Sequence, residues 1–374
     1  MRVLVDYRAA LRERSGVGEY THQLVAALLR RAAGYGARST LDLWLFSSSW
    51  KDRLRVTPDV AAAHAVDRRV PVALLNFAWH RLQWPPAELL TGAALDVTHA
   101  LHPLIVPSRH AAPIVTIHDL NFLKHPERTR AEIRRDYPAL VREHAHRARR
   151  IITISEFTAG DIVSILGVPR DKIVVCHPAA PSWTPLDVRP HDGYILFLGT
   201  LEPRKNVGAL LDAYEHLVTR RPQPSAPPLV LAGKATDEAK PWLARIERPP
   251  LSGRVRHVGY VDPDKRRELY AGARLLVQPS FEEGFGMPVL EAMTLGVPVV
   301  AANRGALPEV LGDAGLLVDP ERPVEIAAAI ERMLADEALR DASVARGLER
   351  ARAFNWDRTA SLVYDAYLSA CASA

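Results

Sequence analysis

Short runs of apolar and β-branched residues alternate along the chain with longer stretches in which apolar residues recur every three or four positions. Such alternation is typical of strand–helix units whose parallel sheets are covered on both faces. In the first half, the pattern predicts strands at 2–7, 41–46, 95–98, 113–117 and 150–154 and helices at 18–31 and 130–149. In the second half, it predicts strands at 194–198, 229–232, 255–261, 274–278 and 297–301 and helices at 207–218, 265–271, 288–295 and 356–370.

The pattern is interrupted once, where four prolines (Pro178, Pro181, Pro185 and Pro190) crowd a stretch without periodicity. Such a stretch is typical of an interdomain linker. We therefore predict two doubly wound α/β domains, residues 1–180 and 193–356, joined by a linker at 181–192. Because sheets of this kind bind ligands at the carboxyl ends of their strands, the loops that follow the strands are the candidate sites.

Composition narrows the class of protein. The chain has 374 residues, of which 48% are hydrophobic, enough for two or three globular cores. No run of 18 apolar residues occurs, and Met1–Tyr7 resembles a first strand rather than a secretory signal. Two cysteines cannot form a disulfide framework, so we expect a reducing, cytoplasmic compartment. The net charge of +5 arises from an arginine-rich composition, so it does not by itself indicate a nucleic-acid or membrane partner.

A first candidate loop begins at Gly199 and ends with Arg204 and Lys205, just before the helix at 207–218. The N-terminus of a helix carries partial positive charge, which disfavours nearby cations and favours an anion. We therefore interpret Arg204 and Lys205 as residues that grip a diphosphate. The alternative is that they are two solvated charges in a surface loop.

A second candidate loop spans residues 279–287 and opens the next helix. Gly286 permits a tight turn, and Pro288 suits the first position of a helix whose free N–H groups again favour an anion. Glu283 in the loop and Glu291 in the helix can approach one ligand from different levels, with Glu291 accepting hydrogen bonds from a ribose diol. The alternative is that both glutamates only cap the helix or complement its dipole.

Two further strand ends in the first half carry candidate residues. Gly16 and Gly18 form a turn before a helix, but Thr21 occupies the place of the third glycine in the dinucleotide fingerprint, so an NAD site is not favoured. His118 and Asp119 follow a strand directly. A histidine in that position can contact a ligand, and the alternative is a structural histidine.

Signals for a metal or for nucleic acid are weak. Asp262 and Asp264 have the spacing of a divalent-cation clamp, yet they precede a helix, where an N-cap aspartate is the simpler explanation. No histidine–cysteine cluster suggests zinc, and no motif suggests a DNA groove. We expect no metal, no cofactor and no nucleic-acid partner.

The predicted helix between Arg130 and Arg150 has a local excess of arginine. Near an anionic bilayer each cation contributes about 1 kcal/mol, so this helix could hold the protein at the inner face of a membrane. The alternative is an ordinary solvated helix in an arginine-rich protein.

Seven residues separate Glu283 from Glu291. The segment that contains both resembles the hallmark of the retaining nucleotide-sugar glycosyltransferases of family four. The similar segments occur in both halves of the chain, in the family's order: 16–20, 116–120, 199–206, 283–293, 296–300, 305–310 and 312–316. The resemblance implies a GT-B fold, in which two Rossmann-like domains face each other across a cleft and the terminal helix, 357–374, returns to the first domain. It also implies that the second domain binds the nucleotide-sugar donor and the first the acceptor.

The resemblance further implies roles for single residues. Arg204 and Lys205 match the residues that neutralise the leaving diphosphate, Glu291 the ribose ligand and Glu283 the carboxylate beside the transferred sugar. His118 matches a histidine near that sugar. The remaining donor-binding residues implied are Gly16, Asp119, Gly199, Phe285, Gly286 and Met287. Members of the family need no metal, and the leaving phosphate itself is thought to take the proton of the acceptor.

The sequence of residues 116–120 most resembles that of mannosyl and rhamnosyl transferases of cell-surface polysaccharide assembly. This resemblance favours GDP-mannose as donor and a glycan or lipid-linked acceptor. Other functions stay open at this point: a nucleotide-sugar epimerase of the same fold, a transferase acting on a small natural product, a phosphorylase that needs pyridoxal phosphate, or a sensor that binds without turnover.

Overall fold

The structure, a computed structural model, describes residues 1–11, 16–34, 41–48, 50, 52–126, 131–187, 190, 192–220 and 226–372. The chain forms two compact units, Met1–Ala179 together with Asn355–Ala374, and Ala180–Phe354. We call them unit 1 and unit 2. The boundary at Ala179 lies beside the start of the segment expected to be a linker, and the terminal helix is part of unit 1.

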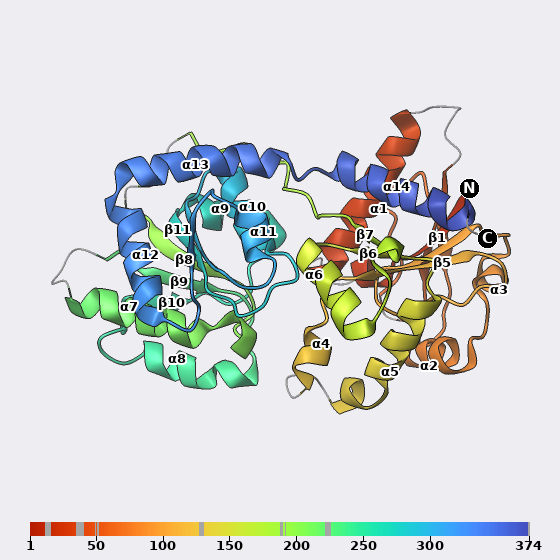
Figure 1. The fold of residues 1–374 in the computed structure, drawn as a ribbon, viewed down its shortest axis with the longest axis horizontal. Helices are drawn as coiled ribbons and strands as arrows, with labels where there is room; N and C mark the ends of the chain where they lie inside the picture. Colours follow the sequence, from red (N-terminus) through yellow and green to blue (C-terminus); the bar gives the residue numbers. More distant parts are fainter. Residues whose placement is uncertain are drawn as a thin grey trace. The chain divides into compact units, whose positions relative to one another are not determined.

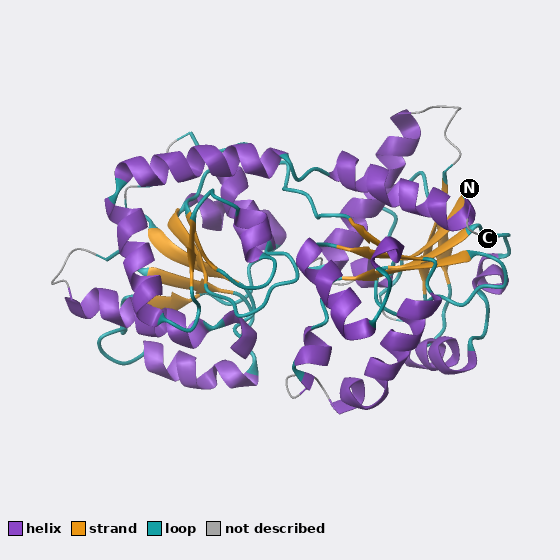
Figure 2. Cartoon of the chain, viewed as in Figure 1, coloured by secondary structure: helices purple, strands orange, loops and turns teal. Residues whose placement is uncertain are grey.

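Unit 1 contains a parallel seven-stranded sheet in the order β3-β2-β1-β4-β5-β6-β7, with helices on both faces (Figures 1 and 2). Its strands are β1 (Arg2–Asp6), β2 (Asp42–Ser47), β3 (His64–Asp67), β4 (Val97–Ala100), β5 (Ala112–Ile117), β6 (Arg150–Thr153) and β7 (Ile173–Val175). Its helices include α1 (Val17–Gly34), α2 (Val72–Phe77), α3 (Ala87–Thr91), α4 (Asn121–Lys124), α5 (Ala131–Arg147), α6 (Glu156–Asp161) and α14 (Trp356–Ala372).

Burial of both faces explains why most residues of the central strands β1 and β5 are apolar. Leu4, Phe46 and Trp79 are fully buried members of one core cluster. The terminal helix α14 packs on α1 and on β4 to β7, and its Tyr367 donates to or accepts from His99 Nδ1 at 2.8 Å. Sequence segments more than 250 residues apart are thereby held in one unit.

Unit 2 contains a parallel six-stranded sheet in the order β10-β9-β8-β11-β12-β13. Its strands are β8 (Tyr194–Leu198), β9 (Leu229–Ala232), β10 (Val255–His257), β11 (Ala273–Gln278), β12 (Val299–Ala302) and β13 (Leu316–Val318). Its helices are α7 (Val207–Arg220), α8 (Lys240–Ile246), α9 (Pro263–Ala271), α10 (Met287–Leu295), α11 (Leu307–Leu311), α12 (Pro323–Ala335) and α13 (Glu337–Arg352).

The predicted elements differ from the observed ones at the sheet edges and in the helices that were missed. The strand expected at 255–261 ends at His257, which pairs with Leu231 of β9. The short strands β3, β7 and β13 were not predicted. The described helices that were not predicted are α2, α3, α4, α6, α8, α11, α12 and α13.

Candidate active site

The strand order of unit 2 brings two loops together. β8 pairs with β9 on one side and with β11 on the other, so the direction of winding reverses between β8 and β11. Ligands of open α/β sheets bind at such switch points, beyond the carboxyl ends of the strands. The loops that follow these two strands are residues 199–206 and 279–286, the two candidate loops of the sequence analysis.

A buried ion pair joins these loops. Lys205 Nζ donates to Glu283 Oε1 at 2.5 Å, and both side chains are less than a tenth exposed. The same carboxylate oxygen accepts from Ser280 Oγ at 2.8 Å and from Gln278 Nε2 at 3.0 Å. Glu283 is therefore held from three sides in one orientation. Ser280 and Gln278 were missed by sequence reasoning because neither belongs to a recognisable charge pattern.

The charges of this pair follow from its surroundings. Burial alone would raise the pKa of Glu283, but the Lys205 and Arg204 charges, together with hydrogen bonds from Lys205 and Ser280, lower it to about 2. Burial lowers the pKa of Lys205, although Glu283 favours the charged ammonium. At neutral pH Glu283 is thus a carboxylate that faces a cation rather than a proton donor.

Arg204 lies at the same junction but is more accessible. Its Nε is 2.7 Å from Glu202 Oε1, and its Nη1 lies 3.5 Å from Glu283 Oε2 and donates to the Glu282 carbonyl at 3.3 Å. Asn206, with φ +56°, then turns the chain into α7. Arg204 and Lys205 therefore precede the helix in a separate turn, and both converge on Glu283.

The second candidate loop ends in a glycine that the backbone requires. Gly286 precedes α10 with φ +113°, and a Cβ there would lie 2.7 Å from Leu307 Cδ2. Met287 is the first residue of α10, followed by Pro288. The Phe285 side chain is buried and packs edge-to-face on Phe354 at 5.6 Å between ring centroids. The Phe285 side chain therefore contributes to the core. That the Phe285 backbone binds the donor stays a prediction.

Glu291 is buried in α10 and held by two residues of α9. Arg266 Nη1 donates to Oε1 at 2.7 Å, and Tyr270 OH donates to Oε2 at 2.8 Å. Burial and the neighbouring carboxylate raise the pKa of Tyr270 well above its usual value, so the phenol stays protonated as a donor. Sequence reasoning missed Arg266 and Tyr270. Their spacing of four residues on one helix face, opposite a glutamate, was the available signal.

Two glycines, Gly199 and Gly305, lie close to the residues of the ion pair. Gly199 donates its N–H to the Ala232 carbonyl at 2.9 Å and lies beside the Lys205 side chain. Gly305 adopts φ +61°, and a Cβ there would lie 2.8 Å from the backbone nitrogen of Glu283. Gly305 thus permits the loop that carries Glu283 to come this close.

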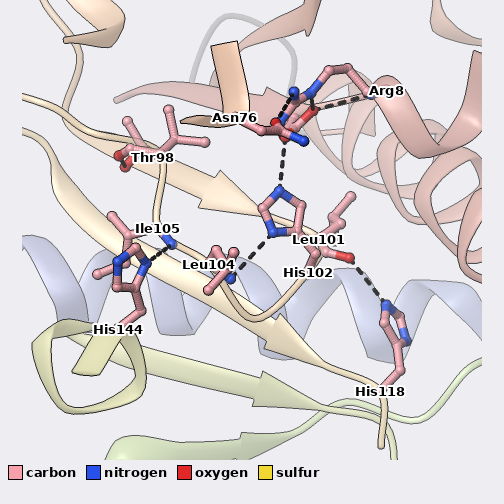
Figure 3. Close-up of polar contacts among 11 residues, drawn as sticks. Arg8, Asn76, Thr98, Leu101, His102, Leu104, Ile105, His118 and His144 are labelled. Carbon is pink, nitrogen blue, oxygen red and sulfur yellow. Dashed lines mark hydrogen bonds and ion pairs between the residues drawn. The ribbon is translucent and has the colours of Figure 1, made fainter. Parts of the chain in front are cut away.

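The candidate residues of the first half lie in unit 1. His118 Nε2 donates to the Leu101 carbonyl at 3.3 Å (Figure 3), and its ring meets Tyr20 edge-to-face at 5.1 Å. Burial lowers the pKa of His118 to about 4, so this histidine is neutral at pH 7. Asp119 Oδ1 accepts from Asn121 N at 3.1 Å, and the Gly16 carbonyl accepts from Tyr20 N at 3.0 Å. Their expected roles at a donor stay predictions.

The sequence offered Asp262 and Asp264 as a weak candidate for a metal site. Among the residues that the structure describes, no group of three His, Cys, Asp or Glu side chains lies close enough to hold a metal ion. Asp262 is the N-cap residue of α9, and the Asp264 side chain lies outside the described part.

Within the described ranges, none of the helices has the length and apolar character needed to span a bilayer. Arg130 lies outside the described residues, as do the side chains of 131–136.

A family model described as "Glycosyl transferases group 1" matches residues 192–336. O-antigen chain mannosyltransferase B of Escherichia coli is 37% identical over 276 residues, which cover 70% of this chain and 71% of that protein. Serotype-specific mannosyltransferase WbdA, also of Escherichia coli, is 29% identical over 297 residues, covering 75% of this chain but only 34% of its own length.

Solved structures share the fold over the whole chain. A sucrose-phosphate synthase from Thermosynechococcus elongatus superposes with a TM-score of 0.78 at 20% identity, covering 100% of this chain and 99% of that one. WaaG, a glycosyltransferase of lipopolysaccharide biosynthesis, superposes with a TM-score of 0.71 at 15% identity, covering 98% and 99%. The two parallel-sheet units are thus those of the GT-B fold, and the chain belongs to the group 1 glycosyltransferases, family four.

Proposed function

We propose that this glycosyltransferase moves a mannosyl residue from GDP-mannose to a glycan or lipid-linked acceptor in the assembly of a cell-surface polysaccharide. The names of two relatives, an O-antigen chain mannosyltransferase and a serotype-specific mannosyltransferase, support mannose as the sugar. Rhamnose, the other sugar favoured by residues 116–120, is the alternative that the donor experiment below separates.

The observation that carries this proposal is the convergence of Arg204 and Lys205 on Glu283 at the switch point of unit 2. Departure of a nucleoside diphosphate leaves negative charge on phosphate and positive charge on the anomeric carbon. Cations held in advance stabilise the first charge, and a fixed carboxylate stabilises the second. We assign Arg204 and Lys205 to the diphosphate, Glu283 to the sugar and Glu291 to the ribose.

We further propose that the reaction retains the anomeric configuration and needs no metal. Lys205 is a buried ammonium that can neutralise phosphate without a divalent ion, and Glu283 is tied to Lys205, Ser280 and Gln278 rather than free to attack the sugar. The acceptor would then attack from the face that the diphosphate leaves, and a phosphate oxygen would take its proton.

Donor binding tests the proposal directly. Thermal unfolding is recorded with GDP-mannose, UDP-glucose or dTDP-rhamnose, with and without EDTA, since a ligand raises stability with the logarithm of its excess over Kd. We expect GDP-mannose to stabilise the protein, EDTA to change nothing, and Arg204→Met to weaken the effect. Product NMR then reports the anomeric configuration. No shift with any donor, or isomerised sugar from donor alone, would overturn the proposal.

We also propose that unit 1 contacts an anionic membrane surface beside α5. Arg142 and Arg147 on this helix are exposed, and Arg147 Nη2 donates to Gln83 Oε1 at 2.7 Å. That bond joins α5 to a segment in which Phe77, Leu82 and Trp84 are each more than half exposed. Exposed aromatic and aliphatic side chains beside arginines are typical of surfaces that lie in the headgroup region of a bilayer.

A further inference from the structure

Asn206 adopts a backbone conformation that few residues tolerate. Its φ of +56° and ψ of +39° lie in the left-handed region, at the point where the short turn Pro203–Lys205 ends and α7 begins. Within the described ranges, Asn206 and Gln83 are the non-glycine residues with positive φ. Glycine adopts this conformation freely, and among the other residues asparagine and aspartate adopt it most readily. The backbone at this position therefore favours glycine, asparagine or aspartate.

The Asn206 side chain supplies what glycine and aspartate cannot. It is buried, and its Nδ2 donates to the Pro279 carbonyl at 3.1 Å and to the Pro320 carbonyl at 2.7 Å. Because an amide nitrogen carries two hydrogens, one group satisfies both carbonyls. Aspartate would place a further acceptor against these two acceptors, and glycine would remove the donor from both. Backbone and side chain together therefore specify asparagine.

The two carbonyls belong to loops that follow different strands. Pro279 follows β11 directly, and Pro320 lies two residues beyond the end of β13. Asn206 itself ends the loop after β8, and β8 is the neighbour of β11 in the sheet (Figure 1). One buried side chain thus ties together three loops at the carboxyl edge of the sheet in unit 2.

These contacts hold Lys205 between two fixed points. On one side of Lys205, the Asn206 side chain is bonded to the start of the loop that leads to Glu283. On the other side, the Arg204 carbonyl accepts from Phe281 N, in the same loop, at 2.8 Å. The two bonds set the distance between the loop that carries the Lys205 ammonium and the loop that carries the Glu283 carboxylate.

We propose that Asn206 is a positioning residue for sugar transfer, which holds the Arg204–Lys205 turn at a fixed distance from the loop of Glu283. The assignment rests on the proposed function, which gives these charges their roles at the diphosphate and the sugar. Charged groups stabilise a transition state only where they are placed before the reaction begins, and a displacement of about 1 Å can lower the rate about a hundredfold. Asn206 acts through Lys205, since its own bonds go to backbone carbonyls.

Asn206→Gly separates the side chain from the backbone conformation. Glycine keeps the left-handed φ without steric cost and removes both hydrogen bonds. Asn206→Asp is the second variant, because aspartate tolerates the same φ but, as a carboxylate, donates no hydrogen bond. Tyr214→Phe is the matched control. Tyr214 is buried in unit 2, and its OH donates to the carbonyl of Pro227, which precedes β9 at the opposite edge of the sheet, at 3.0 Å.

The first experiment combines steady-state kinetics with urea unfolding. We expect Asn206→Gly and Asn206→Asp to lower kcat at least about tenfold while the KM for donor changes less than about threefold, because the cations still bind the donor but no longer match the transition state. Tyr214→Phe should lose stability and keep the wild-type kcat. Wild-type kcat in Asn206→Gly, or an equal fall of kcat in Tyr214→Phe, would overturn the proposal.

The second experiment needs no donor. A double-mutant cycle measures the loss of unfolding free energy that Lys205→Met causes in the wild-type protein and in Asn206→Gly. If Asn206 holds Lys205 against Glu283, the ion pair is already loosened in Asn206→Gly, and Lys205→Met should there cause about half the loss. The same cycle with Tyr214→Phe should be additive. Equal losses in the wild-type and Asn206→Gly backgrounds would overturn the proposal.

The two experiments let this proposal and the proposed function fail separately. If a donor turns over but Asn206→Gly keeps the wild-type kcat, the positioning role is wrong and the proposed function stands. If no donor is used but the cycle couples Asn206 to Lys205, the proposed function fails and the control of the ion pair by Asn206 remains.

Discussion

Lys205 Nζ lies 2.5 Å from Glu283 Oε1, although the two residues are 78 positions apart in the chain. Lys205 follows β8 and Glu283 follows β11, so only the pairing of these two strands brings them together. Each charge is buried and compensated by the other. The pair therefore couples the stability of unit 2 to the residues we assign to the donor.

Removing one charge of this pair should destabilise the protein. Lys205→Met leaves a buried carboxylate without its cation, which typically costs about 3–5 kcal/mol. The double variant Lys205→Met, Glu283→Gln should recover most of that loss but no activity. Urea unfolding and donor turnover measure the two effects. Lys240→Met is the control, because the Lys240–Asp237 pair is exposed and should contribute less than about 1 kcal/mol. Equal losses in the double and single variants would contradict the coupling.

The residues that hold Glu291 should affect donor binding more than the chemical step. Tyr270→Phe removes the hydroxyl donor to Oε2 and should raise the KM for donor about fivefold with little change in kcat. It should also reduce the preference for GDP over 2′-deoxy-GDP, measured by calorimetry, because Glu291 is assigned to the ribose. An unchanged preference, with folding intact, would show that Glu291 does not read the ribose.

Gly305 should matter for activity although it carries no functional group. In Gly305→Ala the new Cβ meets the Glu283 backbone at 2.8–2.9 Å, and φ is +61°, a conformation that L side chains rarely adopt. We expect a loss of about 1–3 kcal/mol in stability and a fall in kcat. Gly160→Ala, in α6 with nothing within 4 Å of its Cβ, is the matched control. Wild-type kcat in Gly305→Ala would show that the position of Glu283 tolerates displacement.

Acid should destabilise unit 1 through its buried histidines. Burial lowers the pKa of His99 and His80 to about 3 and of His118 and His144 to about 4, against an ordinary value of 6.5. The unfolded chain thus binds more protons below pH 6.5, and stability falls from there toward pH 4. Each histidine contributes up to about 1.4 kcal/mol per pH unit. Unfolding free energies at pH 7, 6 and 5 measure the effect, and equal values at pH 7 and 5 would contradict it.

Charge removal on α5 tests the membrane surface. Replacing Arg142 and Arg147 by serine should lower binding to vesicles of phosphatidylglycerol and phosphatidylcholine by roughly fivefold per arginine, since each cation contributes about 1 kcal/mol. Trp84→Ser should weaken binding further, because Trp84 is 61% exposed. Arg248→Ser, an exposed arginine of unit 2, is the control. Unchanged partitioning in the α5 variants would remove the membrane proposal.

Much of the fold could be predicted from local pattern. The bounds of β8 and β9 agree with the prediction, because central strands covered on both faces are continuous apolar runs that end where the apolar run ends. The glycosyltransferase family was also identified correctly, since its motifs are short, contiguous segments. The edge strands β3 and β13 escaped prediction because an edge strand is short and half-solvated, which erases the signal.

The sequence by itself determined which chemical groups stand at the ends of which strands: cations after β8, two carboxylates and a glycine turn after β11, a histidine after β5. The tertiary structure decided which of them meet. Lys205 meets Glu283, Arg266 meets Glu291, and Arg8 meets both Asp6 and Asn76. The reason is physical: periodicity encodes the local backbone and its buried face, whereas contacts between distant residues depend on strand order and register, which hydrophobic patterns of single strands do not specify.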